Sequence, residues 1–230
     1  MLIADVCFNQ QSAINNQQFQ FNSTIRAMQN SVGLPGTLLT HTIAGARLEG
    51  AIRAASVAFF VALTATAAQV SIPLPFTPVP LTLQPMVVLL GGTVLGARLG
   101  MSAQILYLLL GIVGLPVFAA SPVLPQGALR LLGPTGGYLM SYPFAAFVAG
   151  WFAERGLDRR YLTSLLAMAC GLAVIFFGGV MWLAFFARPA VGLDAALRTG
   201  LYPFVPVDIF KLLVAAAVTP GLWKLLGSNR

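Results

Sequence analysis

Long runs without a charged residue constrain this chain more than any other feature of its sequence. No Lys, Arg, Asp or Glu lies between Arg53 and Arg98, between Arg98 and Arg130, between Arg130 and Glu154, or between Arg160 and Arg188. Each run is at least as long as the roughly 20 residues that cross the hydrocarbon core of a bilayer. Backbone N–H and C=O groups in lipid must be paired within the chain, so these runs predict transmembrane helices.

The composition supports the same class. Of the 230 residues, 58% are hydrophobic and 8% are charged, whereas soluble domains carry roughly 25% charged residues. The net charge of +7 is not arranged as a basic stripe interleaved with aromatic residues. We therefore expect no nucleic acid partner, and we attribute the excess to positive charge retained on one side of a membrane.

Six apolar spans follow a polar leader, which predicts an all-α integral membrane protein with six transmembrane helices. The expected spans are residues 51–70, 82–96, 99–117, 135–153, 161–187 and 206–226. Residues 47–230 form this domain. Residues 1–46 are rich in Asn and Gln and are expected to be a disordered or weakly helical extension. A targeting peptide and a misassigned start codon remain alternatives for the leader.

The basic residues predict the orientation of the spans. If the N-terminus is cytoplasmic, the inner segments carry eight Lys and Arg residues and the outer loops carry three, namely Arg130, Arg188 and Arg198. This bias fits the positive-inside rule, with both termini cytoplasmic. The proline-rich segment after the first span, the loop before the fourth span and the start of the sixth span then face outward.

The last span carries an acid and a base three residues apart, Asp208 and Lys211. This spacing places them on one face of a helix, and ionisable residues in a span commonly face a cavity or a partner. A self-neutralising ion pair and a polar ligand site are compatible interpretations. The two groups could accept from an N–H and donate to a C=O of one ligand, such as a cyclic urea.

Two outer segments carry further candidates for binding. Thr135, Gly136 and Tyr138 belong to a Gly-Pro-Thr-Gly-Gly-Tyr string at the start of the fourth span, where free backbone N–H groups could hold an anion or a carbonyl. A tight turn is the alternative, and no Walker-type Gly-Lys-Ser/Thr follows. Four prolines between residues 73 and 80 predict a stiff external cap or a simple hairpin, and Gln84 follows them.

Small residues recur on the first span, at Ala54, Ala58 and Ala62. A stripe of this kind lets helices approach closely in a membrane, and it predicts either internal packing or docking of a separate protein. No Ser/His/Asp set, carboxylate pair or His/Cys cluster is present, so neither an enzyme nor a metal site is expected. A self-contained secondary transporter is a remaining alternative, but no repeated half-helices are seen.

Four segments together resemble the BioY family, the biotin-specific S-components of energy-coupling-factor (ECF) transporters. They are the first-loop run at residues 72–84, the Gly/Pro run at 108–118, the glycine string at 133–139, and the Asp-x-x-Lys at 208–211. The resemblance covers about residues 51–226, and these segments occur in the family's order. Residues 1–46 depart from the family pattern.

The resemblance implies a six-helix subunit that binds biotin at the outer face of the bacterial plasma membrane and needs no cofactor. It also implies partners: a coupling membrane protein and two ABC ATPase subunits. An S-component for another vitamin is the alternative. The expected ligand-binding residues are Asp208, Lys211, Tyr138, Thr135, Gly136 and Gln84, with Phe76, Phe118, Tyr138 and Phe204 as apolar walls. The family's docking motif corresponds to Ala54, Ala58 and Ala62, which favours docking over internal packing.

Overall fold

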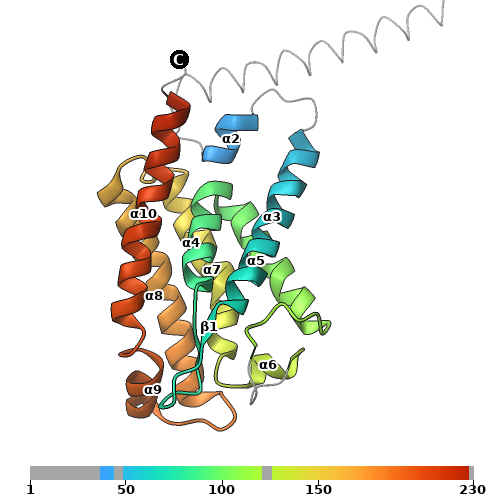
Figure 1. The fold of residues 1–230 in the computed structure, drawn as a ribbon, viewed down its shortest axis with the longest axis vertical. Coiled ribbons are helices and arrows are strands. Elements are labelled where there is room, and N and C mark those ends of the chain that lie inside the picture. The colour runs from blue at the N-terminus through green and yellow to red at the C-terminus, as the bar shows by residue number, and fades with distance from the viewer. Residues whose placement is uncertain (1–36, 44–48, 121–125, 228–230) are drawn as a thin grey trace, which may run out of the picture. The chain divides into compact units, whose positions relative to one another are not determined.

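The computed structural model describes residues 37–43, 49–120 and 126–227. The chain divides into two units, Met1–Pro35 and Gly36–Arg230, and every described residue belongs to the second. Within the described residues the fold is a helical bundle with one short hairpin (Figure 1). The expectation of disorder for residues 1–36 lies outside the described part of the chain.

The six predicted spans all form helices. They are α3 (Glu49–Gln69), α4 (Gln84–Leu95), α5 (Ala97–Ile112), α7 (Gly136–Ala153), α8 (Tyr161–Phe185) and α10 (Val205–Gly227). By length and hydropathy, α3, α8 and α10 can each cross a membrane, while α4 and α5 are shorter apolar helices. The fold therefore matches the predicted class, although its helices differ widely in length.

Helix α7 lies at the centre of the bundle, where it packs against α4, α5 and α8. Most of its residues are buried, including a run of small ones such as Ala145, Ala146 and Ala149. The close approach depends on glycine, because a Cβ added at Gly92 of α4 would lie 2.3 Å from the carbonyl oxygen of Ala146. No hydrophobic force drives helices together in lipid. Small residues of this kind let the backbones approach closely, so that van der Waals contacts hold the helices together.

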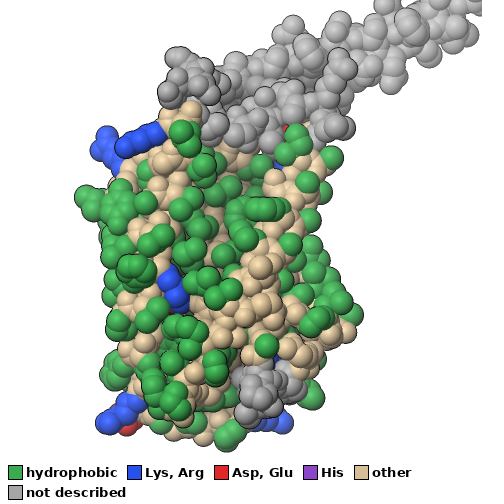
Figure 2. All heavy atoms as spheres, viewed as in Figure 1, with side chains coloured by type: hydrophobic (Ala, Val, Ile, Leu, Met, Phe, Trp, Pro, Cys, Tyr) green, Lys and Arg blue, Asp and Glu red, His purple; other side chains and the backbone are tan. Residues whose placement is uncertain are grey.

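Large apolar side chains cover the outside of the bundle. Phe59 on α3, Leu162 and Phe177 on α8, and Phe210 on α10 are each at least 60% exposed. Figure 2 shows hydrophobic side chains spread along one whole face, with basic side chains mostly towards its two ends. A soluble protein seldom exposes a contiguous apolar surface of this extent, so the surface fits a lipid environment.

A two-stranded hairpin follows α3. Strand β1 (Ser71–Ile72) pairs antiparallel with β2 (Leu81–Thr82), with Ser71 opposite Thr82. The strands enclose residues 73–80, which we call the cap loop. Helix α4 begins directly after the hairpin and has a proline in its first turn, where the missing N–H costs nothing.

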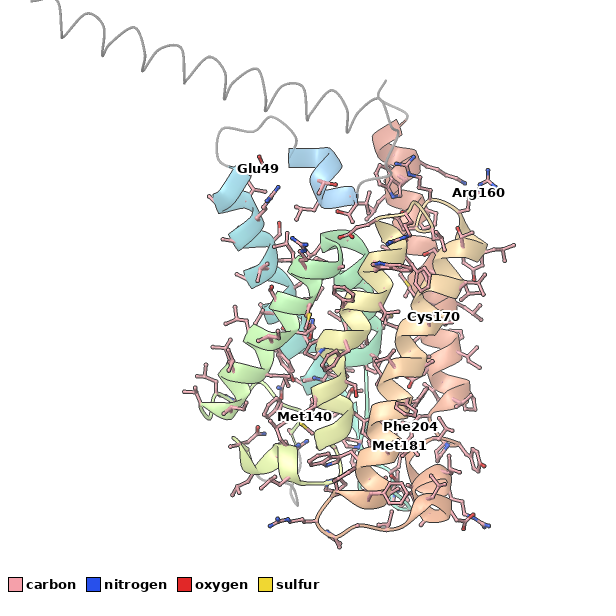
Figure 3. The ribbon with its side chains drawn as sticks, turned by 180° about the vertical axis from the view of Figure 1, so that it is seen from behind. Glu49, Met140, Arg160, Cys170, Met181 and Phe204 are labelled. Atoms are coloured by element: carbon pink, nitrogen blue, oxygen red, sulfur yellow. The ribbon has the colours of Figure 1, made fainter. Side chains whose placement is uncertain are left out.

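The two ends of the bundle differ in chemistry. Figure 3 places Glu49 and Arg160 at one end and Met140, Met181 and Phe204 at the other. At the first end, in the turn between α7 and α8, Asp158 is fully buried and accepts a 2.6 Å hydrogen bond from Nε1 of Trp223 on α10. Burial raises the pKa of Asp158, and the bond from Trp223 offsets this effect only in part.

Three short helices were not predicted. Helix α2 (Leu38–Ile43) falls within the segment that was expected to be disordered or weakly helical, and its Leu38 and Leu39 are buried. The two leucines pack against the bundle, while the expected boundary near residue 46 stays a prediction. Helices α6 (Leu129–Leu132) and α9 (Leu193–Gly200) lie in the loops before α7 and α10.

Candidate ligand-binding site

A pocket lies at the end of the bundle that carries Phe204. Its empty volume, including its open mouth, is about 570 Å³. Apolar and aromatic side chains form most of the wall, and the polar groups come from β2, α4, α6, α7 and α10. The lining residues are Val79, Pro80, Thr82, Gln84, Pro85, Phe118, Ala119, Arg130, Thr135, Tyr138, Leu139, Tyr142, Ile175, Phe176, Phe204, Asp208 and Lys211.

Asp208 and Lys211 form one polar side of this pocket. Both side chains are less than 10% exposed, and Nζ of Lys211 lies 2.6 Å from Oδ1 of Asp208. The same ammonium donates a 2.6 Å hydrogen bond to the carbonyl of Thr82 at the end of the hairpin. The predicted ion pair therefore exists and borders a cavity, whereas the polar ligand site stays a prediction.

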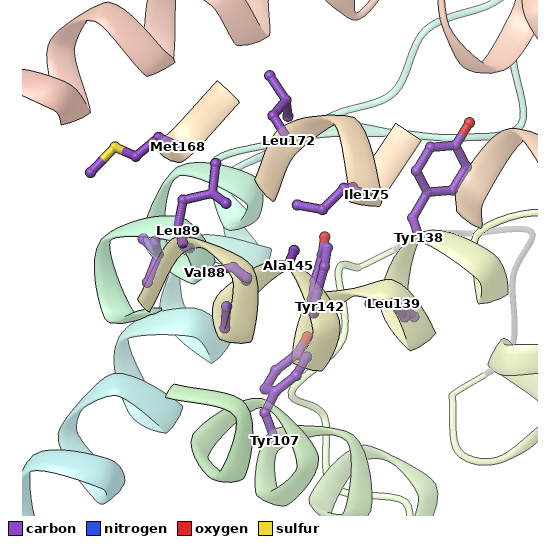
Figure 4. Close-up of a cluster of buried hydrophobic side chains, with 14 of the residues drawn as sticks. Val88, Leu89, Tyr107, Tyr138, Leu139, Tyr142, Ala145, Met168, Leu172 and Ile175 are labelled. Atoms are coloured by element: carbon purple, nitrogen blue, oxygen red, sulfur yellow. The ribbon is translucent and has the colours of Figure 1, made fainter. Parts of the chain in front are cut away.

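Gln84 continues this polar side. Its Oε1 accepts a bond from the Thr82 hydroxyl at 3.4 Å, and its Nε2 donates to the Tyr107 hydroxyl at 2.6 Å. The Tyr107 hydroxyl in turn donates to the carbonyl of Val117. Figure 4 shows Tyr107 from α5 next to Tyr142 from α7 within the buried cluster. This chain of bonds fixes the orientation of the Gln84 amide.

Arg130 and Thr135 add two further polar groups to the lining. Arg130 is 1% exposed, and its Nη2 donates a 3.0 Å bond to the carbonyl of Ala119. Thr135 precedes the first turn of α7, and its buried hydroxyl has no hydrogen-bond partner among the described residues. A guanidinium and a free hydroxyl beside a helix N-terminus can hold a carboxylate.

Sequence reasoning missed Arg130 as a site residue because it was counted only as an outer-loop charge. The available signal was its position five residues before Thr135 in an otherwise uncharged loop. With Arg130 and Lys211 against Asp208, the pocket carries two cationic groups and one anionic group. A lining with more positive than negative groups favours a ligand that carries a negative charge.

Two predicted site residues are not part of the pocket wall. Gly136 does not line the cavity; a Cβ there would lie 1.8 Å from the Leu131 carbonyl oxygen, so this glycine permits a close backbone contact. Phe76 is 59% exposed and lies outside the wall. The other expected wall residues, Phe118, Tyr138 and Phe204, do line it.

The small-residue stripe faces away from the bundle. Ala54, Ala58 and Ala62 are all exposed, whereas Phe60, Val61, Thr64, Ala67 and Ala68 form the buried side of α3. The stripe therefore does not serve packing among the described helices. No group of three or more metal-binding side chains occurs in the described part of the chain, and Cys170 is a free, exposed cysteine there.

The helical bundle has an apolar exterior and a pocket with charged side chains at one end. These features define a membrane-embedded protein that binds small molecules. Comparison with known proteins then gives the family. The model of the BioY family matches residues 37–228, and the chain belongs to this family.

Relatives and a solved structure agree with that assignment. A probable biotin transporter BioY from Pyrococcus horikoshii is 45% identical over 166 residues, covering 72% of this chain and 93% of the relative. The biotin transporter BioY from Thermotoga maritima is 42% identical, covering 72% of this chain and 92% of the relative. The crystal structure of the S-component for biotin from an ECF-type ABC transporter matches with a TM-score of 0.70. It is 27% identical, over 79% of this chain and 95% of that one.

Proposed function

We propose that this protein is a biotin-uptake S-component that captures biotin at the outer face of the membrane and passes it inward. One observation carries the proposal: the pocket combines a few charged and polar groups, among them Asp208, Lys211 and Arg130, with mostly apolar walls. Biotin has the same distribution of chemistry, with a ureido head, an apolar bicycle and chain, and a terminal carboxylate. The names of its relatives support the same ligand.

The ureido head fits the side of the pocket formed by Asp208 and Lys211. Oδ1 of Asp208 is occupied by Lys211, which leaves Oδ2 to accept from a ureido N–H. Lys211 has three donors, of which two reach Asp208 and the Thr82 carbonyl. The third donor is then available to the ureido carbonyl.

The carboxylate fits the side formed by Arg130 and Thr135. The Thr135 hydroxyl can donate to one carboxylate oxygen, and the guanidinium supplies a fixed positive charge at low exposure. A charge-assisted bond in a buried site is roughly twice as strong as a neutral one. A carboxylate there also balances the excess positive charge of the pocket.

The partners and the orientation belong to the same proposal. The matched crystal structure is an S-component of an ECF-type ABC transporter, which supports assembly with a coupling membrane protein and two ATPase subunits. The exposed Ala54, Ala58 and Ala62 stripe offers a smooth docking surface. We place the protein in the plasma membrane with both termini cytoplasmic, as the distribution of basic residues favours.

A binding panel tests the proposal directly. Purified protein in lipid nanodiscs is titrated with labelled biotin, riboflavin and thiamine, and with biotin amide, which keeps the head but lacks the negative charge. We expect saturable binding of biotin, weaker binding of the amide and none of the other vitamins. Binding of another vitamin in preference to biotin would refute the assignment while leaving the S-component fold intact.

A further inference from the structure

The C-terminal end of α9 presents two carbonyl groups that the helix itself does not use. The N–H that would normally bond to the carbonyl of Thr199 belongs to residue 203, which is a proline and has no N–H. The Phe204 N–H, four residues after Gly200, bonds to Leu201 instead. Buried or half-buried carbonyls at a helix end require other donors.

Two hydroxyl groups from distant parts of the chain supply those donors. Thr77 in the cap loop donates to the carbonyl of Thr199 at 2.7 Å, across 122 residues of sequence. Tyr138 in the pocket wall donates to the adjacent carbonyl of Gly200, also at 2.7 Å. Figure 1 shows the segment after β1 running alongside α9. We call the carbonyls of Thr199 and Gly200 the α9 clasp.

The contact at Tyr138 is close. A Cβ added at Gly200 would lie 2.3 Å from the Tyr138 hydroxyl oxygen, so the glycine permits this approach. Phe204, four residues after Gly200, also lines the pocket. The clasp therefore joins three parts of the site: the cap loop, the α7 wall and the segment that enters α10.

The cap loop has a stiff backbone, so one hydrogen bond at Thr77 affects the position of the whole loop. Four prolines between residues 73 and 80 restrict its backbone. The Thr77 hydroxyl also accepts a 3.2 Å bond from the Val79 N–H. Val79 and Pro80 line the pocket, so holding Thr77 holds the part of the loop that forms the pocket wall.

We infer that Thr77 is a positioning residue that keeps the cap loop closed on the α9 clasp and thereby sets how long the ligand stays bound. The inference rests on the proposed function. Release of the ligand requires the Thr77–Thr199 bond to break, whereas the polar contacts at Asp208 and Arg130 are separate from it. Thr77 therefore governs the dissociation rate more than the association rate.

Two variants weaken the same bond from opposite sides. Thr77→Val removes the hydroxyl and keeps the shape of the side chain. Pro203→Ala supplies a second donor, which shares the Thr199 carbonyl with the Thr77 hydroxyl and so weakens their bond without altering the cap loop. A neutral hydrogen bond corresponds to about a 2- to 12-fold change in rate. We expect each variant to speed biotin dissociation within that range, and the double variant to add little, because one bond is affected in both.

The controls distinguish loss of the Thr77–Thr199 hydrogen bond from a general loss of structure. Thr77→Ser should restore slow dissociation, and Thr66→Val on α3, whose exposed hydroxyl bonds only to its own helix at Ala62, should change nothing. Unchanged dissociation in Thr77→Val, or additive effects of Thr77→Val and Pro203→Ala, would overturn the inference.

A second readout needs no ligand and so separates this inference from the proposed function. Spin labels are placed at Phe76→Cys in the cap loop and at Asp194→Cys on α9, both exposed sites, with Cys7 and Cys170 replaced by alanine. Thr77→Val should broaden the distance distribution between the labels. An unchanged distribution contradicts the positioning role of Thr77. A broadened distribution together with absent biotin binding contradicts only the proposed ligand.

Discussion

Replacing Asp208 with asparagine tests the central ion pair most directly. The asparagine oxygen can still accept the bond from Lys211, so the amide nitrogen faces the pocket where a carboxylate oxygen faced it before. An amide donor then meets a ureido N–H donor. A hydrogen bond to a charged group contributes about 1.5–3 kcal/mol, so we expect Asp208→Asn to weaken biotin binding about 10- to 150-fold.

The same change affects stability through Lys211. Removing one partner of a buried pair costs about 3–5 kcal/mol because the other charge remains. The lower end applies here, since Lys211 keeps its bond to the Thr82 carbonyl. The double variant Asp208→Asn, Lys211→Met should recover much of the lost unfolding free energy but not the binding of biotin.

Titration calorimetry and thermal unfolding in nanodiscs measure the two effects separately. The matched control is Asp194→Asn on α9, because Asp194 is paired with Arg198 but both side chains are more than 70% exposed. An exposed pair of this kind contributes at most about 1 kcal/mol. Unchanged biotin affinity in a folded Asp208→Asn protein would remove Asp208 from the site and refute the argument.

Three further predictions concern other parts of the chain. Arg130→Gln should weaken biotin binding at least about tenfold and leave the binding of biotin amide nearly unchanged; equal losses for both ligands would contradict its role at the carboxylate. Ala58→Leu should reduce co-purification with the coupling protein but not biotin binding, while Ala173→Leu, at an exposed site on α8, should affect neither. Burial raises the pKa of Asp158, so its contribution to stability is fully present below the ordinary value of 3.8 and is lost as pH rises through the folded-state pKa. Asp158→Asn should therefore flatten the pH dependence of thermal unfolding above the ordinary Asp pKa of 3.8, and an unchanged slope would contradict this.

The helical spans could be predicted because lipid imposes a local rule. Any stretch that crosses the bilayer must be apolar and must pair its own backbone, so the runs between charges already mark α3, α8 and α10. The same reasoning did not predict helix α2. Its buried leucines gain stability only from the bundle that surrounds them, and the polar sequence before them suggested disorder.

The acid and base of the site were also visible in the sequence. Asp208 and Lys211 are costly in a span unless they are paired or face a cavity, and their spacing puts them on one helical face. Arg130 was not identified, because a charge in a loop carries no such cost until the fold buries it. Gly136 was assigned to ligand binding, but its neighbour is the Leu131 carbonyl.

The sequence by itself determined that this protein lies in a lipid bilayer, how many spans it has and which two residues form its intramembrane ion pair. These properties depend on composition and on spacing within one helix. Only the tertiary structure decided that Arg130 and Lys211 line the same cavity, and that Thr77 and Tyr138 meet adjacent carbonyls of α9. Those contacts join residues far apart in the chain, and no local pattern encodes the packing that brings them together.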